Sequence, residues 1–157
     1  LYLFLRNSYY NIRGGDGLLS KEFNQIFCKF SDEDLSNFGF CNTEVFKTID
    51  KEYDLSKRAI KQIRTNCVTF AEDSNFHNDG FGPTVLYYAN LEWMPYWSGH
   101  TLFLNETLDE AEYTCLYKPG RVVVFDGSIP HLILTPNTMC RTPRLTFVIQ
   151  YTDIVAN

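Results

Sequence analysis

From residue 67 to residue 151 the chain is a succession of short β-prone runs separated by turn-forming residues. Pairs such as Gly82-Pro83, Pro119-Gly120 and Asp126-Gly127 punctuate the runs. Strands are predicted at residues 67–71, 84–90, 100–105, 113–117, 121–125, 131–135 and 144–151. Many short strands at this spacing are typical of an antiparallel sandwich or barrel. We therefore expect a mostly β fold with flanking helices packed outside it.

The N-terminal third has a mixed character. Residues 1–5 are predicted to form an edge strand, and the glycine-rich residues 13–17 a turn. Two helices are predicted, one that begins at the N-cap Ser20 and one over residues 54–63. Their apolar positions at helical spacing are Phe23, Ile26, Phe27 and Phe30 in the first, and Leu55, Ala59, Ile60 and Ile63 in the second. The expected organisation is a single domain, 1–157, with a helical or mixed support segment at 1–65 and a β core at 66–152.

Charge, hydropathy and cysteine content restrict the partners and the cellular compartment that we expect. The net charge of −5 argues against nucleic acid as a partner, because phosphate binding requires clustered Lys and Arg. No apolar run approaches the roughly 18 residues of a membrane span, so no membrane partner is expected. The five cysteines are widely spaced and include no C-x-x-C pair. They indicate free thiols in a reducing compartment, and a cytoplasmic location is expected.

His77 and Asp79 are the most informative pair for chemistry. In an extended segment, two residues separated by one point to the same side. His131, 54 residues later in the chain, is the best candidate for a third ligand. Two imidazoles and a carboxylate favour Fe(II), or Zn²⁺, over Ca²⁺ and Mg²⁺, which prefer oxygen ligands. The sequence therefore predicts a metal site, and an ordinary surface turn is the alternative interpretation of the H-x-D pair.

The last predicted strand, residues 144–151, combines an apolar face with a partly polar one. Arg144 and Thr146 share the second face, because side chains alternate along a strand. A buried guanidinium requires a partner, and a bound carboxylate would accept hydrogen bonds from both residues. The alternative is an arginine that reaches solvent from the strand end. Tyr88 is predicted either to donate to a ligand inside the barrel or to serve as a core residue.

These residues together resemble the 2-oxoglutarate- and Fe(II)-dependent oxygenases, and among them the prolyl 4-hydroxylase-like branch. The resemblance covers residues 67–151, a little over half of the chain. Besides H-x-D, residues 84–93 (TVLYYANLEW) are similar to the Y-Y-L-N-x-x-W segment of the branch. Residues 98–104 (SGHTLFL) are similar to its G-G-x-L segment, while His131 and Arg144-x-Thr146 match its distal histidine and its R-x-S/T motif.

The resemblance implies a double-stranded β-helix, or jelly-roll, fold in which His77, Asp79 and His131 hold the iron. It implies that 2-oxoglutarate chelates this iron, that Arg144 binds the distal carboxylate, and that Thr146 and Tyr88 assist there. Dioxygen is the other cosubstrate, and ascorbate an optional reductant. The implied reaction is hydroxylation of an unactivated C–H bond, expected on a prolyl residue of a peptide or protein. The carboxylate of Asp79 favours hydroxylation over halogenation.

Several alternatives stay open at this point. One alternative is that the substrate is a small molecule. Another is that the protein is a non-catalytic, cupin-like metal-binding module. Arg141 is a second candidate for the carboxylate clamp, although Arg144 is preferred because Thr146 shares its face. His100 replaces the second glycine of the G-G pair and is either a substrate contact or a bystander. Candidates for substrate packing are Trp93, Tyr96 and Trp97, and residues 14–51 are a candidate lid or a buttress for the sheet.

Overall fold

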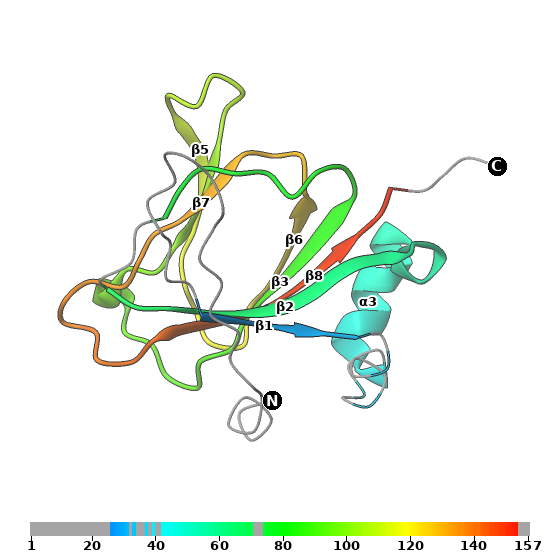
Figure 1. Cartoon of the computed structure of the whole chain (residues 1–157), viewed down its shortest axis with the longest axis horizontal. Helices are drawn as coiled ribbons and strands as arrows, with labels where there is room; N and C mark the ends of the chain where they lie inside the picture. Colours follow the sequence, from blue (N-terminus) through cyan, green and yellow to red (C-terminus); the bar gives the residue numbers. More distant parts are fainter. Residues whose placement is uncertain are drawn as a thin grey trace.

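Two antiparallel sheets form the body of the protein (Figure 1). The structure is a computed structural model that describes residues 26–31, 33, 37, 39, 42–70 and 74–153. Within these residues the larger sheet has five strands in the order β1-β2-β8-β3-β6, and the smaller sheet has three in the order β5-β4-β7. The strands are β1 (Ile26–Phe30), β2 (Ile60–Val68), β3 (Pro83–Tyr88), β4 (Thr101–Leu104), β5 (Ala111–Cys115), β6 (Val122–Asp126), β7 (His131–Ile133) and β8 (Arg144–Tyr151).

An aromatic core lies between the two sheets. Leu86 and Tyr88 of β3 and Val148 of β8 enter it from the larger sheet, and Phe103 of β4 enters it from the smaller sheet. Because successive side chains of a strand point to opposite faces, every second residue of β3 and β8 faces this interior. The complete buried cluster is Leu86, Tyr88, Trp93, Phe103, Cys115, Tyr117, Phe125, Cys140 and Val148.

The opposite face of the larger sheet is covered by α3 (Glu44–Tyr53) and the 3-10 helix η2 (Leu55–Lys57), as Figure 1 shows. The side chain of Thr43 caps α3 by accepting a hydrogen bond from the Phe46 N–H at 3.1 Å. Asp54, with φ of 51°, ends the helix in the left-handed region. The second buried cluster is Phe46, Leu55, Ile63, Val85, Phe147, Ile149 and Tyr151. β8 is thus buried on both faces, which fits its position at the centre of the sheet.

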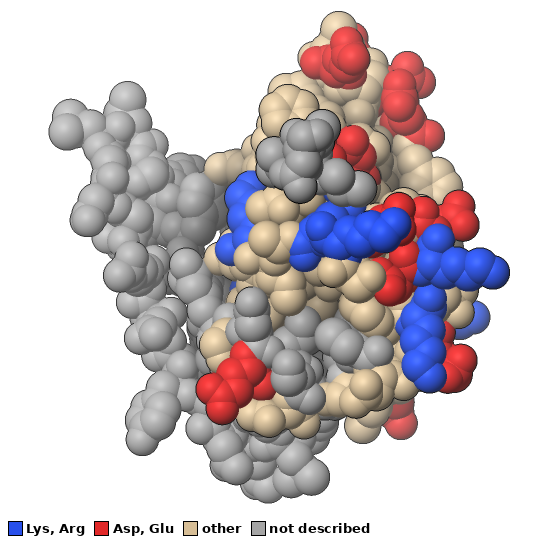
Figure 2. All heavy atoms as spheres, turned by 90° about the vertical axis from the view of Figure 1, so that its right-hand side faces the viewer, with Lys and Arg blue, Asp and Glu red and all other residues tan. Residues whose placement is uncertain are grey.

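The side of the molecule on which α3 lies carries charges of both signs. Figure 2 shows Lys and Arg side chains next to Asp and Glu side chains there. Lys47 pairs with Glu44 at 2.7 Å, and Lys57 pairs with Asp54 at the same distance. Pairs as exposed as these contribute little to stability. Because each of these Lys side chains lies next to an acidic one, their charges largely cancel on this surface.

Both helix predictions for the N-terminal third were wrong where the structure describes them. Residues 26–30 form β1, which pairs antiparallel with β2, and residues 60–63 begin β2 instead of ending a helix. Before β2 the described residues include a helix at Glu44–Tyr53 instead. Leu55, Ile60 and Ile63 fit a helical spacing, but they belong to η2 and β2, and pairing of β2 with β8 decides their conformation. β2 also crosses the predicted division between residues 65 and 66.

The mostly β fold with flanking helices is confirmed, as are the later strands. The predicted strands from residue 84 onward correspond to β3–β8, with small shifts at their ends. The strand predicted at 67–71 overlaps only the end of β2. The predictions for residues 1–5, for residues 13–17 and for a helix start at Ser20 lie outside the described residues. Cys115 and Cys140 are free thiols.

None of the helices in the described residues has the length and apolar character that a bilayer crossing requires.

Candidate metal and cosubstrate site

The segment that carries His77 and Asp79 connects β2 to β3 and is fixed to β7 by backbone hydrogen bonds. The N–H of His77 donates to the carbonyl of His131 at 3.1 Å, and the N–H of His131 donates to the carbonyl of His77 at 2.9 Å. The N–H of Asp79 donates to the carbonyl of Gly127 at 2.7 Å. Gly127 must be small, because a Cβ there would lie 2.6 Å from the carbonyl oxygen of Gly80 and 3.1 Å from the Cβ of Asp79. The backbone therefore brings the three predicted ligands together.

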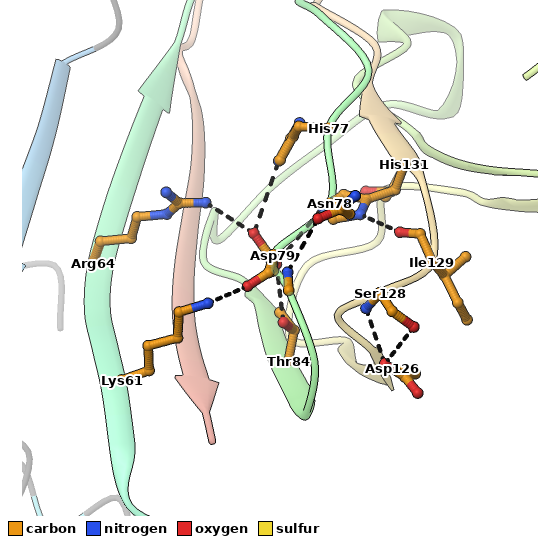
Figure 3. A network of polar contacts seen from close by, with 12 residues as sticks. Lys61, Arg64, His77, Asn78, Asp79, Thr84, Asp126, Ser128, Ile129 and His131 are labelled. Carbon is orange, nitrogen blue, oxygen red and sulfur yellow. Dashed lines mark hydrogen bonds and ion pairs between the residues drawn. The ribbon is translucent and has the colours of Figure 1, made fainter. Parts of the chain in front are cut away.

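The three side chains form a compact donor set. One ligand atom from each of His77, Asp79 and His131 can be chosen so that all lie within 4.8 Å of one another. Nε2 of His77 is 4.0 Å from Oδ1 of Asp79, and Nε2 of His131 is 3.7 Å from Oδ2. Figure 3 shows His131 beside Asp79, with His77 above them. His77 is 40% exposed in its side chain, whereas His131 and Asp79 are nearly enclosed, so the site opens on the His77 side.

Hydrogen bonds at the far ring nitrogens set the tautomers of both histidines. Nδ1 of His77 lies 3.1 Å from the carbonyl of Asn75, and Nδ1 of His131 lies 2.9 Å from the carbonyl of Ile129. A carbonyl only accepts, so each Nδ1 carries the proton and each Nε2 keeps its lone pair for a metal. Burial lowers the pKa of His131, and the nearby His77 and Arg64 act in the same direction. His131 is therefore neutral at pH 7, as a metal ligand must be.

Three residues hold the carboxylate of Asp79 and its backbone. Thr84 of β3 donates its hydroxyl to Oδ2 of Asp79 at 2.9 Å. Lys61 and Arg64 both extend from β2 toward Asp79 (Figure 3). Lys61 donates to the main-chain oxygen of Asp79, and Nη2 of Arg64 is 3.7 Å from Oδ1. The sequence had indicated none of these contacts, because they depend on pairing between strands.

Arg144 is completely buried at the start of β8. Its Nε donates to the carbonyl of Gly99 at 2.7 Å, and its Nη2 donates to the hydroxyl of Thr101 at 3.3 Å. The rings of Tyr88 and Tyr117 lie 5.4 and 5.2 Å from its guanidinium carbon. Nη1 of Arg144 has no hydrogen-bond partner. Among the described residues no carboxylate forms an ion pair with it, so this buried cation lacks an anion.

Thr146 lies on the same face of β8 and is also completely buried. Its hydroxyl has no hydrogen-bond partner. The strand register places it directly between Asn66 of β2 and Tyr88 of β3. Tyr88 is fully buried and its hydroxyl is 2.9 Å from that of Thr101, the residue that also contacts Arg144. The predicted cosubstrate residues therefore gather on one wall, and buried Asn66 joins them although the sequence had not indicated it.

The alternative candidates fall outside this polar wall. Arg141 is exposed, whereas Arg144 is buried. His100 accepts a hydrogen bond at Nδ1 from the N–H of Tyr117 at 3.2 Å, and burial lowers the pKa of His100. Trp93 belongs to the core and donates through Nε1 to the carbonyl of Ser98 at 3.0 Å.

Gly99 allows the close packing between this loop and Arg144. Its φ is 82°, and a Cβ there would lie 2.8 Å from the indole of Trp93 and 3.5 Å from Cδ of Arg144. Tyr96 is exposed and Trp97 is half-buried, so both still fit a role in substrate packing.

The donor sets fit the two groups that the resemblance implies. Two neutral imidazoles and one carboxylate suit a divalent transition metal, and they leave further coordination positions free. A buried, unpaired guanidinium N–H beside an unpaired hydroxyl suits a carboxylate that accepts from both. His77, Asp79 and His131 would hold the metal, while Arg144 and Thr146 would bind the far end of a dicarboxylate.

The fold is shared with solved structures of oxygenases. An oxidoreductase of the 2OG-Fe(II) oxygenase family from Burkholderia pseudomallei matches with a TM-score of 0.67 at 8% identity, over 96% of this chain and 76% of that one. A prolyl hydroxylase from Trichoplax adhaerens, in complex with a hypoxia inducible factor oxygen degradation domain peptide fragment, matches with a TM-score of 0.63 at 16% identity, over 97% and 74%. A Pseudomonas putida prolyl-4-hydroxylase matches with a TM-score of 0.60 at 15% identity, over 83% and 70%.

These matches confirm the expected double-stranded β-helix fold. No protein-family model matches the sequence, and no curated protein sequence does so either.

Proposed function

We propose that this protein is a dioxygenase that requires Fe(II) and 2-oxoglutarate and hydroxylates an unactivated C–H bond. The observation that supports it most strongly is the buried, unpaired pair of Arg144 Nη1 and Thr146 Oγ1 in the same interior as the His77, Asp79 and His131 cluster. A metal-binding β-barrel without a dicarboxylate cosubstrate has no need of this pair, which is costly to bury without a partner. The oxygenase fold described above is consistent with the proposal.

Each residue of the site has a distinct role in this proposal. His77, Asp79 and His131 hold the metal, and the carbonyls of Asn75 and Ile129 select the tautomer in which Nδ1 carries the proton of the neutral ring and Nε2 faces the metal. Arg144 and Thr146 orient 2-oxoglutarate by its distal carboxylate, and Tyr88 and Thr101 position the guanidinium. When bound, the metal and cosubstrate would supply the oxidation, in which 2-oxoglutarate and dioxygen give succinate, CO₂ and one oxygen atom for the substrate C–H bond. The apolar side chains of the interior exclude water from this chemistry.

The proposed substrate is a prolyl residue of a peptide or protein. The site opens on the side of His77, and the side chain of the adjacent Phe76 is exposed, which offers apolar surface that a peptide could contact. The Trichoplax adhaerens neighbour is a prolyl hydroxylase in complex with a peptide fragment, which supports the same class of substrate.

Two measurements test the proposal. Purified protein with Fe(II), ascorbate and 2-oxoglutarate should form succinate, and mass spectrometry of a proline-containing peptide library should detect products heavier by one oxygen atom. A metal that raises the melting temperature while 2-oxoglutarate neither binds nor is consumed would contradict the proposal and favour the cupin-like module. Succinate formation with oxidation of a small molecule, and of no peptide, would move the substrate to the alternative class.

A further inference from the structure

Arg64 is a charged residue that the proposed roles leave unused. It lies on β2 and faces the interior, since the register places it opposite Val148 of β8, a member of the core between the sheets. Its guanidinium extends toward Asp79 (Figure 3). Nη2 is 3.7 Å from Oδ1 of Asp79, which is beyond hydrogen-bond distance. The contact is thus an ion pair without a hydrogen bond, and it leaves donors of Arg64 available.

A second observation indicates that Arg64 has a hydrogen-bond donor that a ligand could satisfy. Its Nε is buried and has no hydrogen-bond partner. The side chain is nevertheless 26% exposed, so part of it is accessible to solvent. Asp79 cannot satisfy Arg64 fully, because Oδ2 of Asp79 already accepts from Thr84 and the carboxylate is shared with two histidines. A buried guanidinium nitrogen without an acceptor is unfavourable unless a ligand supplies one.

Charge around the site becomes more positive when a metal binds. Without metal, Asp79 is the carboxylate beside Arg64 and Lys61. A divalent cation held by Asp79 would neutralise this carboxylate. The net charge of the ion, Asp79, Arg64 and Lys61 together would then be strongly positive. Binding of a second anion would offset this excess of positive charge. An anion held by the same ion as Asp79 would lie next to the Asp79 carboxylate, whose Oδ1 is 3.7 Å from Nη2 of Arg64, so Arg64 would be a cation available to it.

We infer that Arg64 binds the carboxylate of a 2-oxo acid at its metal-chelating end, so that the cosubstrate is held by arginines at both ends, Arg64 near the metal and Arg144 far from it. This inference rests on the proposed function, because it assumes that the cosubstrate is a 2-oxo acid. Arg64 is a cosubstrate-binding residue in this scheme, and it also opposes binding of a metal on its own. Removal of Arg64 therefore has opposite effects on the affinity for a metal and on the affinity for a metal-bound carboxylate.

The test compares Arg64→Met with Lys61→Met and Arg64→Lys by isothermal titration under argon. Lys61→Met is the matched control, because Lys61 extends from the same strand to the same residue but contacts only its main-chain oxygen. Each protein is titrated with Mn²⁺ alone, and then, loaded with Mn²⁺, with oxalate and with 2-oxoglutarate. Oxalate probes the metal end only, and 2-oxoglutarate probes both ends.

Arg64→Met is expected to bind Mn²⁺ at least as tightly as the wild type, but to bind oxalate and 2-oxoglutarate roughly 10-fold or more weakly, the usual effect of losing a charged hydrogen bond. Arg64→Lys should recover part of the loss. Weaker binding of all three probes would indicate a merely structural role and overturn the inference, as would a loss no larger than that of Lys61→Met. If the Mn²⁺-loaded wild type binds oxalate but not 2-oxoglutarate, the proposed function fails instead, while the oxalate data still decide the role of Arg64.

Discussion

His77 and His131 exchange two main-chain hydrogen bonds, so the two imidazoles are held side by side by the backbone itself. Their ring centroids are 4.3 Å apart. The candidate metal site is therefore organised without a metal, and binding of an ion would not have to order the ligands. It also follows that the side chains can be changed without loss of the backbone connection between them.

We expect His77→Ala to retain the fold and to lose metal binding. The imidazole is partly exposed and contributes no core packing, whereas its Nε2 is one of three donors. Mn²⁺ at 100 times its dissociation constant should stabilise the wild type by about 2.7 kcal/mol and raise its melting temperature. His100→Ala is the control, since His100 is the one other histidine of the sequence and should leave this shift intact. An equal shift in His77→Ala would contradict the assignment of the metal ligands.

We expect Thr84→Val to weaken metal binding by roughly 10-fold. The replacement keeps the shape of the side chain in its buried position but removes the hydroxyl that donates to Oδ2 of Asp79. The carboxylate then loses the contact that orients it. Thr84→Ser, which keeps the hydroxyl, should bind Mn²⁺ nearly as the wild type does. Fluorescence or calorimetric titration with Mn²⁺ measures both, and equal affinities for the two variants would show that the hydroxyl does not orient Asp79.

We expect Arg144→Met to abolish measurable binding of 2-oxoglutarate by the Mn²⁺-loaded protein while Mn²⁺ itself still binds. The guanidinium is buried and pairs with no carboxylate among the described residues, and methionine fills a similar volume without a donor. Arg141→Met is the matched control, because Arg141 is exposed and only three positions away. Calorimetric titration with 2-oxoglutarate measures the affinity of each variant for the cosubstrate. A larger loss in Arg141→Met would identify Arg141 as the clamp.

Stability should fall at alkaline pH because two buried tyrosines resist ionisation. Burial raises the pKa of Tyr117 to about 12, from an ordinary value of 10.0. Burial raises the pKa of Tyr88 as well. Between pH 10 and pH 12 the unfolded chain loses a proton that folded Tyr117 keeps, so the contribution of Tyr117 is complete below pH 10 and is lost as the pH rises.

For Tyr117 this amounts to about 2–3 kcal/mol. Urea unfolding at several pH values measures it, and Tyr117→Phe should show a shallower decrease above pH 10. That variant should also be less stable at neutral pH, because the hydroxyl contacts Asn90 and the carbonyl of Leu145. An unchanged slope would mean that Tyr117 ionises as freely in the folded protein as in the unfolded chain.

The β part of the fold was predictable because its signals are local. Pairs such as Pro119-Gly120 and Asp126-Gly127 break the chain, and β8 alternates between faces that enter two different clusters. β2 was missed because long-range pairing with β1 and β8 determines it, and both of its faces contain buried residues. α3 was missed although Phe46, Ile49 and Tyr53 have the spacing of one helix face and Thr43 caps its start.

The candidate site was predictable to the extent that its residues occur in an ordered motif. His77, Asp79 and His131 come together as expected, and the burial of Arg144 and Thr146 excludes the solvent-exposed alternative for that arginine. Arg64 and Asn66 were not predicted, because they enter the site only through the register of β2 against β8. The sequence predicted a helix over residues 54–63, so it placed Arg64 and Asn66 on no common strand.

The position of the proposed metal ligands in the two sheets has a consequence for the dynamics of the protein. His77 and Asp79 precede a strand of the larger sheet, whereas His131 begins β7 of the smaller sheet. An ion bound by all three is thus a cross-link between the sheets that closes a loop of 54 residues. Hydrogen exchange should then slow on Mn²⁺ addition in β4, β5 and β7 more than in β2 and β8, since the three-stranded sheet has fewer partners of its own and opens at lower cost.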